Sequence, residues 1–430
     1  MMRPHRTPLL ILCMAAVGLL PLQSKAQDDP DISALLVANQ MPDVVEKASN
    51  WRIFSEAAAG GGVLRSNAST QQSQRLSFDV QYDGTLAQGW RAILSDRLDI
   101  NWPAQISGQN SINTVKEAYL IWQMQNDILL DAGRINVRNG VATGYNPTDF
   151  FRNGALRSIV SADPSSLKEN RQGSVMLRAQ KLWDGGSVTA LFSPKLAEQA
   201  NNASFSLDIG ATNSQNRWLV ALSQKMAEGW APQFLLFKSE QLPTQIGMNL
   251  TTLVNDATVA YVEWSGGRSP SLLAQAYQQQ GLYFPDTSAF RNRTSVGLTY
   301  TTENKISVTT ELEYNGGALD QNKWDALQRG PLAIYGQYRN YLQTVQEAPT
   351  ARAIFVYASW QDALLNHLDL SAMSRFDAVD SSRMSWLEAR FHFSHAEFAL
   401  QWQRNSGNRL SDYGVATKMQ SWQLMARYFF

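Results

Sequence analysis

Apolar and polar residues alternate in many separate segments of this 430-residue chain. In one of them Leu76, Phe78 and Val80 fall at every second position, with Ser77 and Asp79 between them. Successive side chains of a β-strand point to opposite faces, so such a segment predicts a strand with one apolar face and one polar face. The same alternation marks residues 90–99, 117–124, 175–180, 296–300, 306–314, 387–393 and 398–403. The pattern predicts an all-β protein built from amphipathic strands.

The last nine residues continue this pattern to the end of the chain. Trp422, Leu424, Tyr428 and Phe430 share one face of the expected strand. An aromatic final residue with apolar residues at every second position resembles the C-terminal strand of Gram-negative outer-membrane β-barrels. The resemblance implies that the barrel-assembly machinery reads these four residues and that the strand closes the barrel. It also implies outer-membrane lipid and lipopolysaccharide as the surroundings of the protein.

The N-terminus has the features of a secretory signal. Arg3 and Arg6 form a basic start, residues 9–20 are mostly apolar, and small residues precede a cleavage position after Ala26. We therefore expect residues 1–26 to be removed after Sec-type export, with the outer membrane as the destination. Cys13 is the only cysteine and lies in this segment, so the mature chain would form no disulfide, thiolate metal site or cysteine nucleophile.

The composition agrees with a membrane barrel. No stretch after residue 26 approaches the 18 apolar residues of a membrane-spanning helix. The 13 Trp, 14 Tyr and 17 Phe would supply two interfacial aromatic girdles. We expect residues 51–430 to form a single transmembrane antiparallel β-barrel of about 18 strands, within a range of about 16 to 20. Residues 27–50 would be a disordered periplasmic leader, or else a small plug or a contact for a periplasmic partner.

Short turns and longer polar stretches separate the expected strands. Asp83-Gly84 has the composition of a tight turn, whereas residues 101–110, 140–170 and 316–330 are long and polar. This difference predicts short periplasmic turns and long extracellular loops.

The densest group of polar residues lies between residues 131 and 157. Arg134, Asn136 and Arg138 occupy alternate positions, so a strand there would place three donors on one face. An apolar pair in the following loop would let that loop fold into the lumen as a constriction. The residues of the expected constriction loop are Tyr145, Asp149, Phe150 and Phe151.

A second interpretation of the same residues stays open. The segment would then be a surface loop with its phenylalanines in the outer aromatic girdle. Its arginines would form ion pairs with Asp79, Asp99 or Glu117 of neighbouring strands.

Charged residues of the polar faces suggest two walls in the lumen. Arg91, Arg97 and Arg178, with Arg134 and Arg138, would form a basic wall, and acidic residues elsewhere would form the opposite wall. Such an arrangement orients dipolar solutes; the simpler alternative is charge balance in a wet interior. The expected acidic wall consists of Glu311, Glu313 and Glu388.

Together these features predict a porin-like outer-membrane channel for passive passage of small polar or anionic solutes. The alternative is an export or uptake portal for a polysaccharide or a hydrophobic substrate. An outer-membrane hydrolase is less favoured, because the three histidines after residue 26 show no lipase-type or metal-ligand spacing. We expect no enzyme activity, catalytic residue, metal or cofactor. Equal numbers of basic and acidic residues, 37 each, give no footprint for nucleic acid. A homotrimer is a further expectation.

Overall fold

The computed structural model describes residues 49–104, 108–285 and 288–430. The expected signal peptide, residues 1–26, lies outside the described residues, as does the segment 27–50 apart from Ser49 and Asn50. No helix in the described part is long and apolar enough to cross a membrane.

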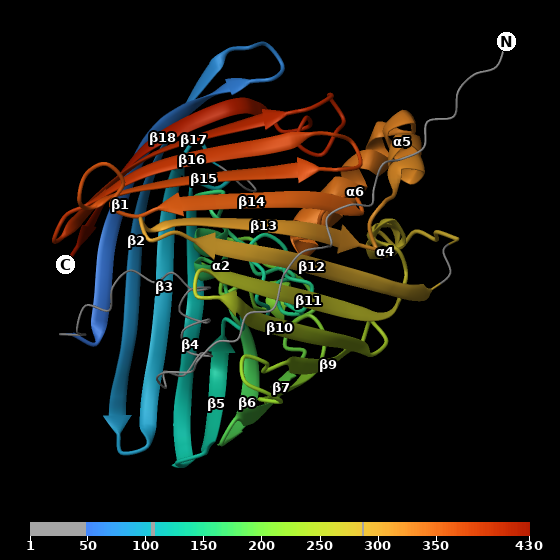
Figure 1. Ribbon diagram of the computed structural model, residues 1–430. Helices are drawn as coiled ribbons and strands as arrows, with labels where there is room; N and C mark the ends of the chain where they lie inside the picture. The colour runs from blue at the N-terminus through green and yellow to red at the C-terminus, as the bar shows by residue number, and fades with distance from the viewer. Residues whose placement is uncertain (1–48, 105–107, 286–287) are drawn as a thin grey trace.

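Eighteen strands in the described ranges form one closed antiparallel barrel (Figure 1). Each strand pairs with its neighbours in sequence, and β1 pairs with β18 to close the ring, from Phe54 opposite Phe429 to Leu64 opposite Lys418. The all-β barrel with about 18 strands is thereby confirmed. The strands are β1 (Trp51–Leu64), β2 (Thr70–Ala87), β3 (Trp90–Trp102), β4 (Ser111–Gln125), β5 (Ile128–Ile135), β6 (Ser174–Trp183), β7 (Gly186–Ser193), β8 (Arg217–Gln224), β9 (Gln233–Ser239), β10 (Gln245–Asn255), β11 (Thr258–Ser269), β12 (Ala289–Thr301), β13 (Ile306–Asn315), β14 (Arg352–Trp360), β15 (Leu368–Asp377), β16 (Arg383–His392), β17 (Ala396–Ser406) and β18 (Lys418–Phe429).

Long and short connections lie at opposite ends of the barrel, because successive strands run in opposite directions. The chain therefore has a long-connection end and a short-turn end. Long connections are residues 136–173, 194–216, 270–288 and 316–351, and short turns are residues 88–89, 126–127, 184–185 and 256–257.

The first short turn differs from the expected one. Asp83-Gly84 lies inside β2, which continues to Ala87, and the chain reverses at residues 88–89. Gly89 there has a φ of 74°, a left-handed conformation that glycine adopts without steric cost. Arg91 Nε donates to Asp83 Oδ1 at 2.5 Å across the hairpin, so this pair holds the two strands together beyond the predicted turn.

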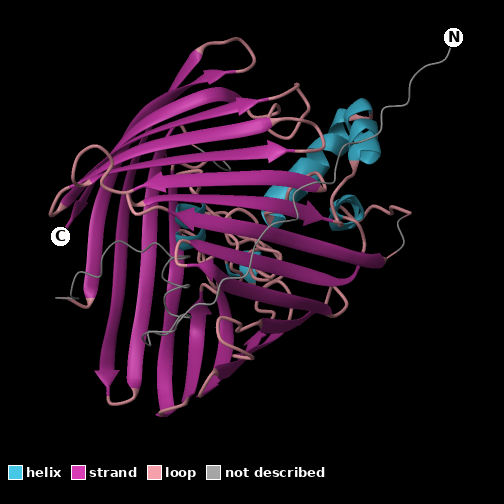
Figure 2. Ribbon diagram, viewed as in Figure 1, coloured by secondary structure: helices cyan, strands magenta, loops and turns pink. Residues whose placement is uncertain are grey.

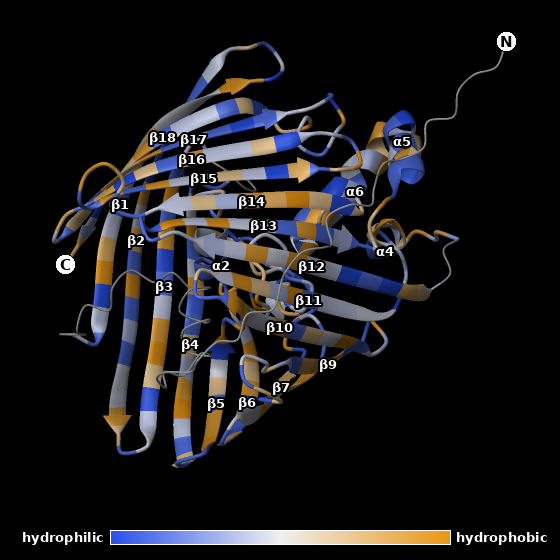
Figure 3. Cartoon of the chain, in the orientation of Figure 1, coloured by the Kyte–Doolittle hydropathy of each residue, from blue (hydrophilic) through white to orange (hydrophobic). Residues whose placement is uncertain are grey.

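Hydrophobic and hydrophilic residues alternate along the strands of the barrel wall (Figure 3). Along β12, Val296, Leu298 and Tyr300 are exposed on the outer face, whereas Ser295, which comes just before them and faces inward, is buried. On β18, the outward side chains of Trp422, Leu424 and Tyr428 are likewise exposed, as is Phe430 directly after the strand. The outer surface therefore carries an apolar band, and most inward side chains are polar.

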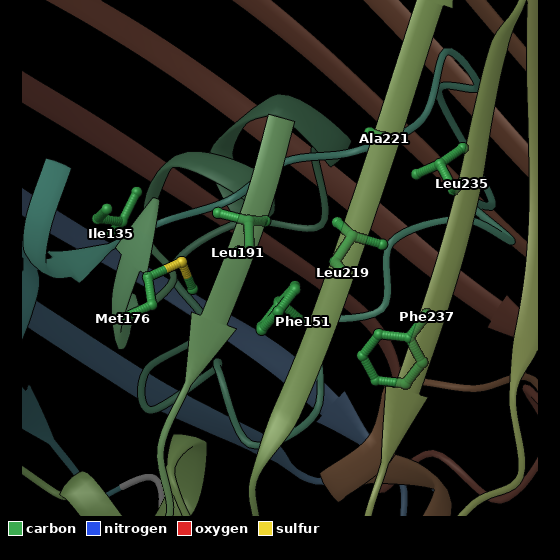
Figure 4. Close-up of a cluster of buried hydrophobic side chains, with 8 residues drawn as sticks. All are labelled: Ile135, Phe151, Met176, Leu191, Leu219, Ala221, Leu235 and Phe237. Carbon is green, nitrogen blue, oxygen red and sulfur yellow. The ribbon is translucent and has the colours of Figure 1, made fainter. Parts of the chain in front are cut away.

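The inward face of β5 to β9 is an exception, because it carries apolar side chains. A buried apolar cluster lies there, which Figure 4 shows in close-up. This apolar cluster consists of Ile135, Phe151, Met176, Leu191, Leu219, Ala221, Leu235 and Phe237.

Helices occur in the long connections (Figure 2). Three of them lie together at the long-connection end, around the fully buried Trp324 and Tyr338. Trp324 Nε1 donates to Asp380 Oδ2 at 3.0 Å, which ties this group to the connection between β15 and β16. The helices are α2 (Pro164–Glu169), α3 (Ile209–Thr212), α4 (Leu272–Gln279), α5 (Gln321–Arg329) and α6 (Leu332–Val345).

Candidate functional site: a loop across the lumen

The connection between β5 and β6, residues 136–173, turns into the barrel and is called the inner loop below. β5 ends at Ile135, which pairs with Ser174. The next backbone amide, Asn136 N–H, donates at 3.3 Å to the side-chain Oε1 of Glu117 on the neighbouring strand β4, and not to a backbone carbonyl. The β-ladder therefore stops at this point, and the chain leaves the wall.

This early end of β5 overturns the expected arginine-bearing strand. Asn136 and Arg138 belong to the inner loop and not to a strand. Arg134 is still in β5, but it shares the outward face with Ala132 and is buried. Its guanidinium donates to the carbonyl of Leu207 at 2.7 Å and so links β5 to the connection 194–216. The three donors therefore do not line one face of a strand.

Glu263 of β11 holds the first part of the inner loop. It is fully buried, and its Oε2 accepts the backbone N–H groups of Val141 at 2.9 Å and Ala142 at 3.0 Å. Its Oε1 accepts both the N–H and the hydroxyl of Thr148, each at 2.8 Å. Both carboxyl oxygens of Glu263 thus accept hydrogen bonds from the inner loop, and this arrangement fixes both ends of the segment 141–148.

Glu311 of β13 holds the middle of the same segment. It is also fully buried, and it accepts the N–H groups of Thr143 at 2.5 Å and Gly144 at 3.0 Å. The hydroxyl of Tyr261 donates to it at 2.5 Å. The ring of Tyr261 lies over Gly297, where any Cβ would collide with it at 2.2 Å. A glycine on β12 is therefore required for this contact.

The phenylalanine pair anchors the inner loop to a further part of the wall, formed by β8 and β9. Phe150 stacks on Phe237 of β9 with ring centroids 4.6 Å apart. Phe151 is 4% exposed and belongs to the apolar cluster (Figure 4). The guanidinium of Arg217, which starts β8, lies 4.6 Å from the Phe151 ring centroid. The pair thus faces the lumen side of the wall and not the outer girdle.

The inner loop then reaches the side of the barrel where the ring closes. The carbonyl of Val160 accepts hydrogen bonds from Arg75 Nη1 of β2 and from Gln423 Nε2 of β18, each at 3.1 Å. Ser161 Oγ donates to Gln401 Oε1 of β17 at 3.3 Å. Because one connection contacts β9, β11, β13 and then β2, β17 and β18, it crosses the whole lumen.

The short helix α2 lies in this crossing segment. Asp163 Oδ2 accepts the N–H of Ser166 at 2.9 Å and caps the helix. Burial raises the pKa of Asp163. Lys168 Nζ donates to the carbonyl of Ala142 at 2.9 Å, and burial lowers the pKa of this lysine. α2 is thereby tied back to the segment that the two glutamates hold.

The other residues expected in the constriction loop, Tyr145 and Asp149, also have hydrogen-bond or ion-pair partners. The hydroxyl of Tyr145 donates to Glu347 Oε2 at 3.0 Å, which links the inner loop to the connection 316–351. Burial raises the pKa of Tyr145. Asp149 forms an ion pair with Arg171 at 2.6 Å, between two parts of the inner loop.

A buried network of charges covers the inward face of β1 to β4. Glu56 Oε1 lies 2.7 Å from Arg75 Nη2 and 3.1 Å from Arg97 Nη2. Lys116 Nζ of β4 lies 2.7 Å from Asp79 Oδ2. Basic and acidic side chains are therefore paired on this wall, which agrees with the alternative of charge balance in the interior. The alternation of Arg75 and Asp79 with Leu76 and Phe78 marks both as inward residues, but Glu56, Arg75 and Lys116 were not among the expected site residues.

The remaining candidate residues lie inward and are paired. Arg91 pairs with Asp83 and Arg178 with Asp131. Glu313 lies 3.3 Å from Arg375, and Glu388 lies 2.9 Å from Arg390. Their contribution to a pore stays a prediction. Among the described residues there is no group of three or more His, Cys, Asp or Glu side chains that could hold a metal ion.

The comparisons with known proteins agree with this architecture. No family model and no curated protein matches the chain. The structure is similar to OccAB1 of Acinetobacter baumannii, with a TM-score of 0.57 and 10% identity over 89% of this chain and 96% of that chain. It is also similar to OccK8 (OprE) of Pseudomonas aeruginosa, with a TM-score of 0.54 and 11% identity over 89% and 98%. OpdQ of Pseudomonas aeruginosa gives a TM-score of 0.50 and 10% identity over 89% and 99%. The chain shares the fold of these structures, and the resemblance to Gram-negative outer-membrane β-barrels is confirmed at the level of the fold.

Proposed function

We propose that this protein is a porin-like channel of the outer membrane that passes small polar solutes by diffusion. The observation that supports this most directly is the inner loop, which crosses the lumen of a closed barrel. Two buried glutamates of the wall, Glu263 and Glu311, hold this loop in place. A fixed obstruction inside a polar barrel narrows the path of a solute and decides which solutes pass.

The chemistry of the two faces supports a membrane location. Only helices and closed barrels satisfy every backbone hydrogen bond in lipid, and this barrel closes between β1 and β18. Its outer face presents apolar and aromatic side chains. In such barrels the short turns face the periplasm and the long connections face outward. We therefore assign the short-turn end, where β1 begins and β18 ends, to the periplasmic side.

The inward side chains at the short-turn end suit polar solutes. Gln81, Asp83, Glu117, Arg178 and Thr189 are inward-facing and partly exposed. A track for a hydrophobic substrate would need apolar side chains along the whole path. The inward apolar residues of β5 to β9 instead pack against Phe151 and are buried.

The test is conductance of the purified, refolded protein in planar lipid bilayers. We expect discrete, stable current steps in potassium chloride, and no steps from a heat-unfolded sample of the same preparation. Folding is checked independently by circular dichroism and by a shift in electrophoretic mobility on heating. Correctly folded protein that inserts but carries no current would contradict the proposed function.

A further inference from the structure

The C-terminal end of α2 places a carboxylate among positive charges. Arg52 Nη1 of β1 is 3.7 Å from Glu169 Oε1, and Gln81 Nε2 of β2 donates to the same oxygen at 3.4 Å. The side chains of Glu169 and Arg52 are 41% and 47% exposed. Glu169 therefore extends from the inner loop towards the wall, in a part of the lumen that solvent reaches.

Four cations act on this carboxylate. They are Lys116, Arg52, Arg427 and Arg138. Burial alone would raise the pKa of Glu169, but these charges together hold the pKa below its usual value. The side chain is therefore ionised at neutral pH.

Two of these cations have carboxylate partners of their own. Lys116 pairs with Asp79 at 2.7 Å, and Arg427 pairs with Glu56 at 2.8 Å. In the described part of the chain, the only carboxylate within ion-pair distance of Arg52 is Glu169. Arg138 is exposed and forms no ion pair with any described residue. It lies near the end of α2, because Asn136 Nδ2 donates to the carbonyl of Lys168 at 3.0 Å.

We propose that Glu169 sets the charge selectivity of the lumen, as a resident carboxylate that neutralises a basic site formed by Arg52 and Arg138. This inference rests on the proposed channel function. An anionic solute with a carboxylate or phosphate group competes with Glu169 for the two guanidinium groups, whereas a cation is attracted by Glu169 itself. Removal of the single negative charge leaves a site that favours anions.

Reversal potentials in a potassium chloride gradient test this directly. We expect Glu169→Gln to raise the permeability ratio of chloride to potassium about fivefold, the effect of one unit charge about 4 Å away in water. Arg138→Gln should lower the ratio. Glu198→Gln is the matched control, because Glu198 is an exposed carboxylate of the connection 194–216 and, among the described residues, pairs with Lys195 alone. A Glu169→Gln channel that conducts with the wild-type ratio would overturn the inference.

A second measurement separates this inference from the proposed function. Refolded wild-type and Glu169→Gln proteins are titrated with inorganic phosphate in detergent by calorimetry. We expect the variant to bind phosphate about tenfold more tightly, because Arg52 and Arg138 lose their competing carboxylate. If the wild type carries no current, the channel function fails, and a gain of phosphate binding still supports the role of Glu169 at the basic site. Equal binding by the two proteins contradicts that role.

Discussion

At the scale of single residues, two buried glutamates decide where the inner loop lies. A buried carboxylate without partners is costly, so Glu263 and Glu311 need the donors that the inner loop supplies. The backbone amides of residues 141–145 and 148 in turn need acceptors, because they belong to no helix or strand. The amides of the loop and the carboxyl groups of the two glutamates thus satisfy each other's hydrogen bonds, and the loop is fixed against the wall of β11 to β13.

Replacement of Glu263 by glutamine tests this arrangement. The amide keeps the size of the side chain, but its NH2 group meets donors such as Thr148 N–H where an acceptor is needed. We expect the free energy of unfolding to fall by about 2–3 kcal/mol, the value of a charged hydrogen bond. Urea titration followed by tryptophan fluorescence measures this loss. Glu303→Gln, in an exposed turn, is the control. Equal stability of the two variants would show that Glu263 does not anchor the loop.

The sequence predicts the faces of these residues but not their partners. Alternation along residues 306–314 places Glu311 and Glu313 on the polar face, and the structure has both inward. Glu263 and Ala142 are more than a hundred positions apart, and nothing near either residue indicates their contact. Such contacts follow from the register of the whole barrel, so Glu263 was not an expected site residue.

At the scale of elements, the inner loop is held by an apolar contact as well as by charge. From the sequence, the phenylalanine pair allows both an inward-folded loop and a surface loop, and the contacts of the pair with Phe237 in the lumen decide for the first. The point at which β5 ends is not predictable from alternation, because Arg134, Asn136 and Arg138 continue the pattern beyond it. The bond from Asn136 N–H to Glu117 ends the ladder, and this contact depends on the neighbouring strand.

The apolar contact is tested by Phe151→Ala, with Phe205→Ala as its control. Phe151 is 4% exposed in the apolar cluster, whereas Phe205 is 69% exposed in the connection 194–216. A buried phenylalanine replaced by alanine costs about 3–5 kcal/mol, and an exposed one about 0.5 kcal/mol or less. We expect faster hydrogen exchange of residues 149–153 in Phe151→Ala only, measured by mass spectrometry. Unchanged exchange in that variant would mean that the cluster does not hold the loop.

At the scale of the whole molecule, the alternation of apolar and polar residues predicts the barrel, but some of its strands lack this pattern. Residues 217–239 contain β8 and β9, and neither showed a polar face in the sequence. The reason is that Leu219, Leu235 and Phe237 face inward against Phe151, so both faces of these strands are apolar. Where the lumen is filled by the inner loop, the signal of a wet interior is lost. The alternating segments alone therefore give no exact strand count, and the closure of β1 with β18 sets the number.

The assignment of inside and outside applies to the whole barrel, and two adjacent residues of β12 test it. Leu298 is exposed on the outer face, and Thr299 faces the lumen, where its hydroxyl lies 2.8 Å from that of Thr309. Arginine on the lipid face of a barrel costs up to about 2–4 kcal/mol, whereas a lumen position is hydrated. We expect Leu298→Arg to lower the folding yield in lipid vesicles strongly and Thr299→Arg to fold almost as the wild type. The folded fraction is read from the electrophoretic mobility of unheated samples. Folding of Leu298→Arg with the yield of Thr299→Arg would contradict a lipid-facing outer wall. A similar loss in both variants would mean that β12 tolerates arginine on neither face, and that Thr299 does not line a hydrated lumen.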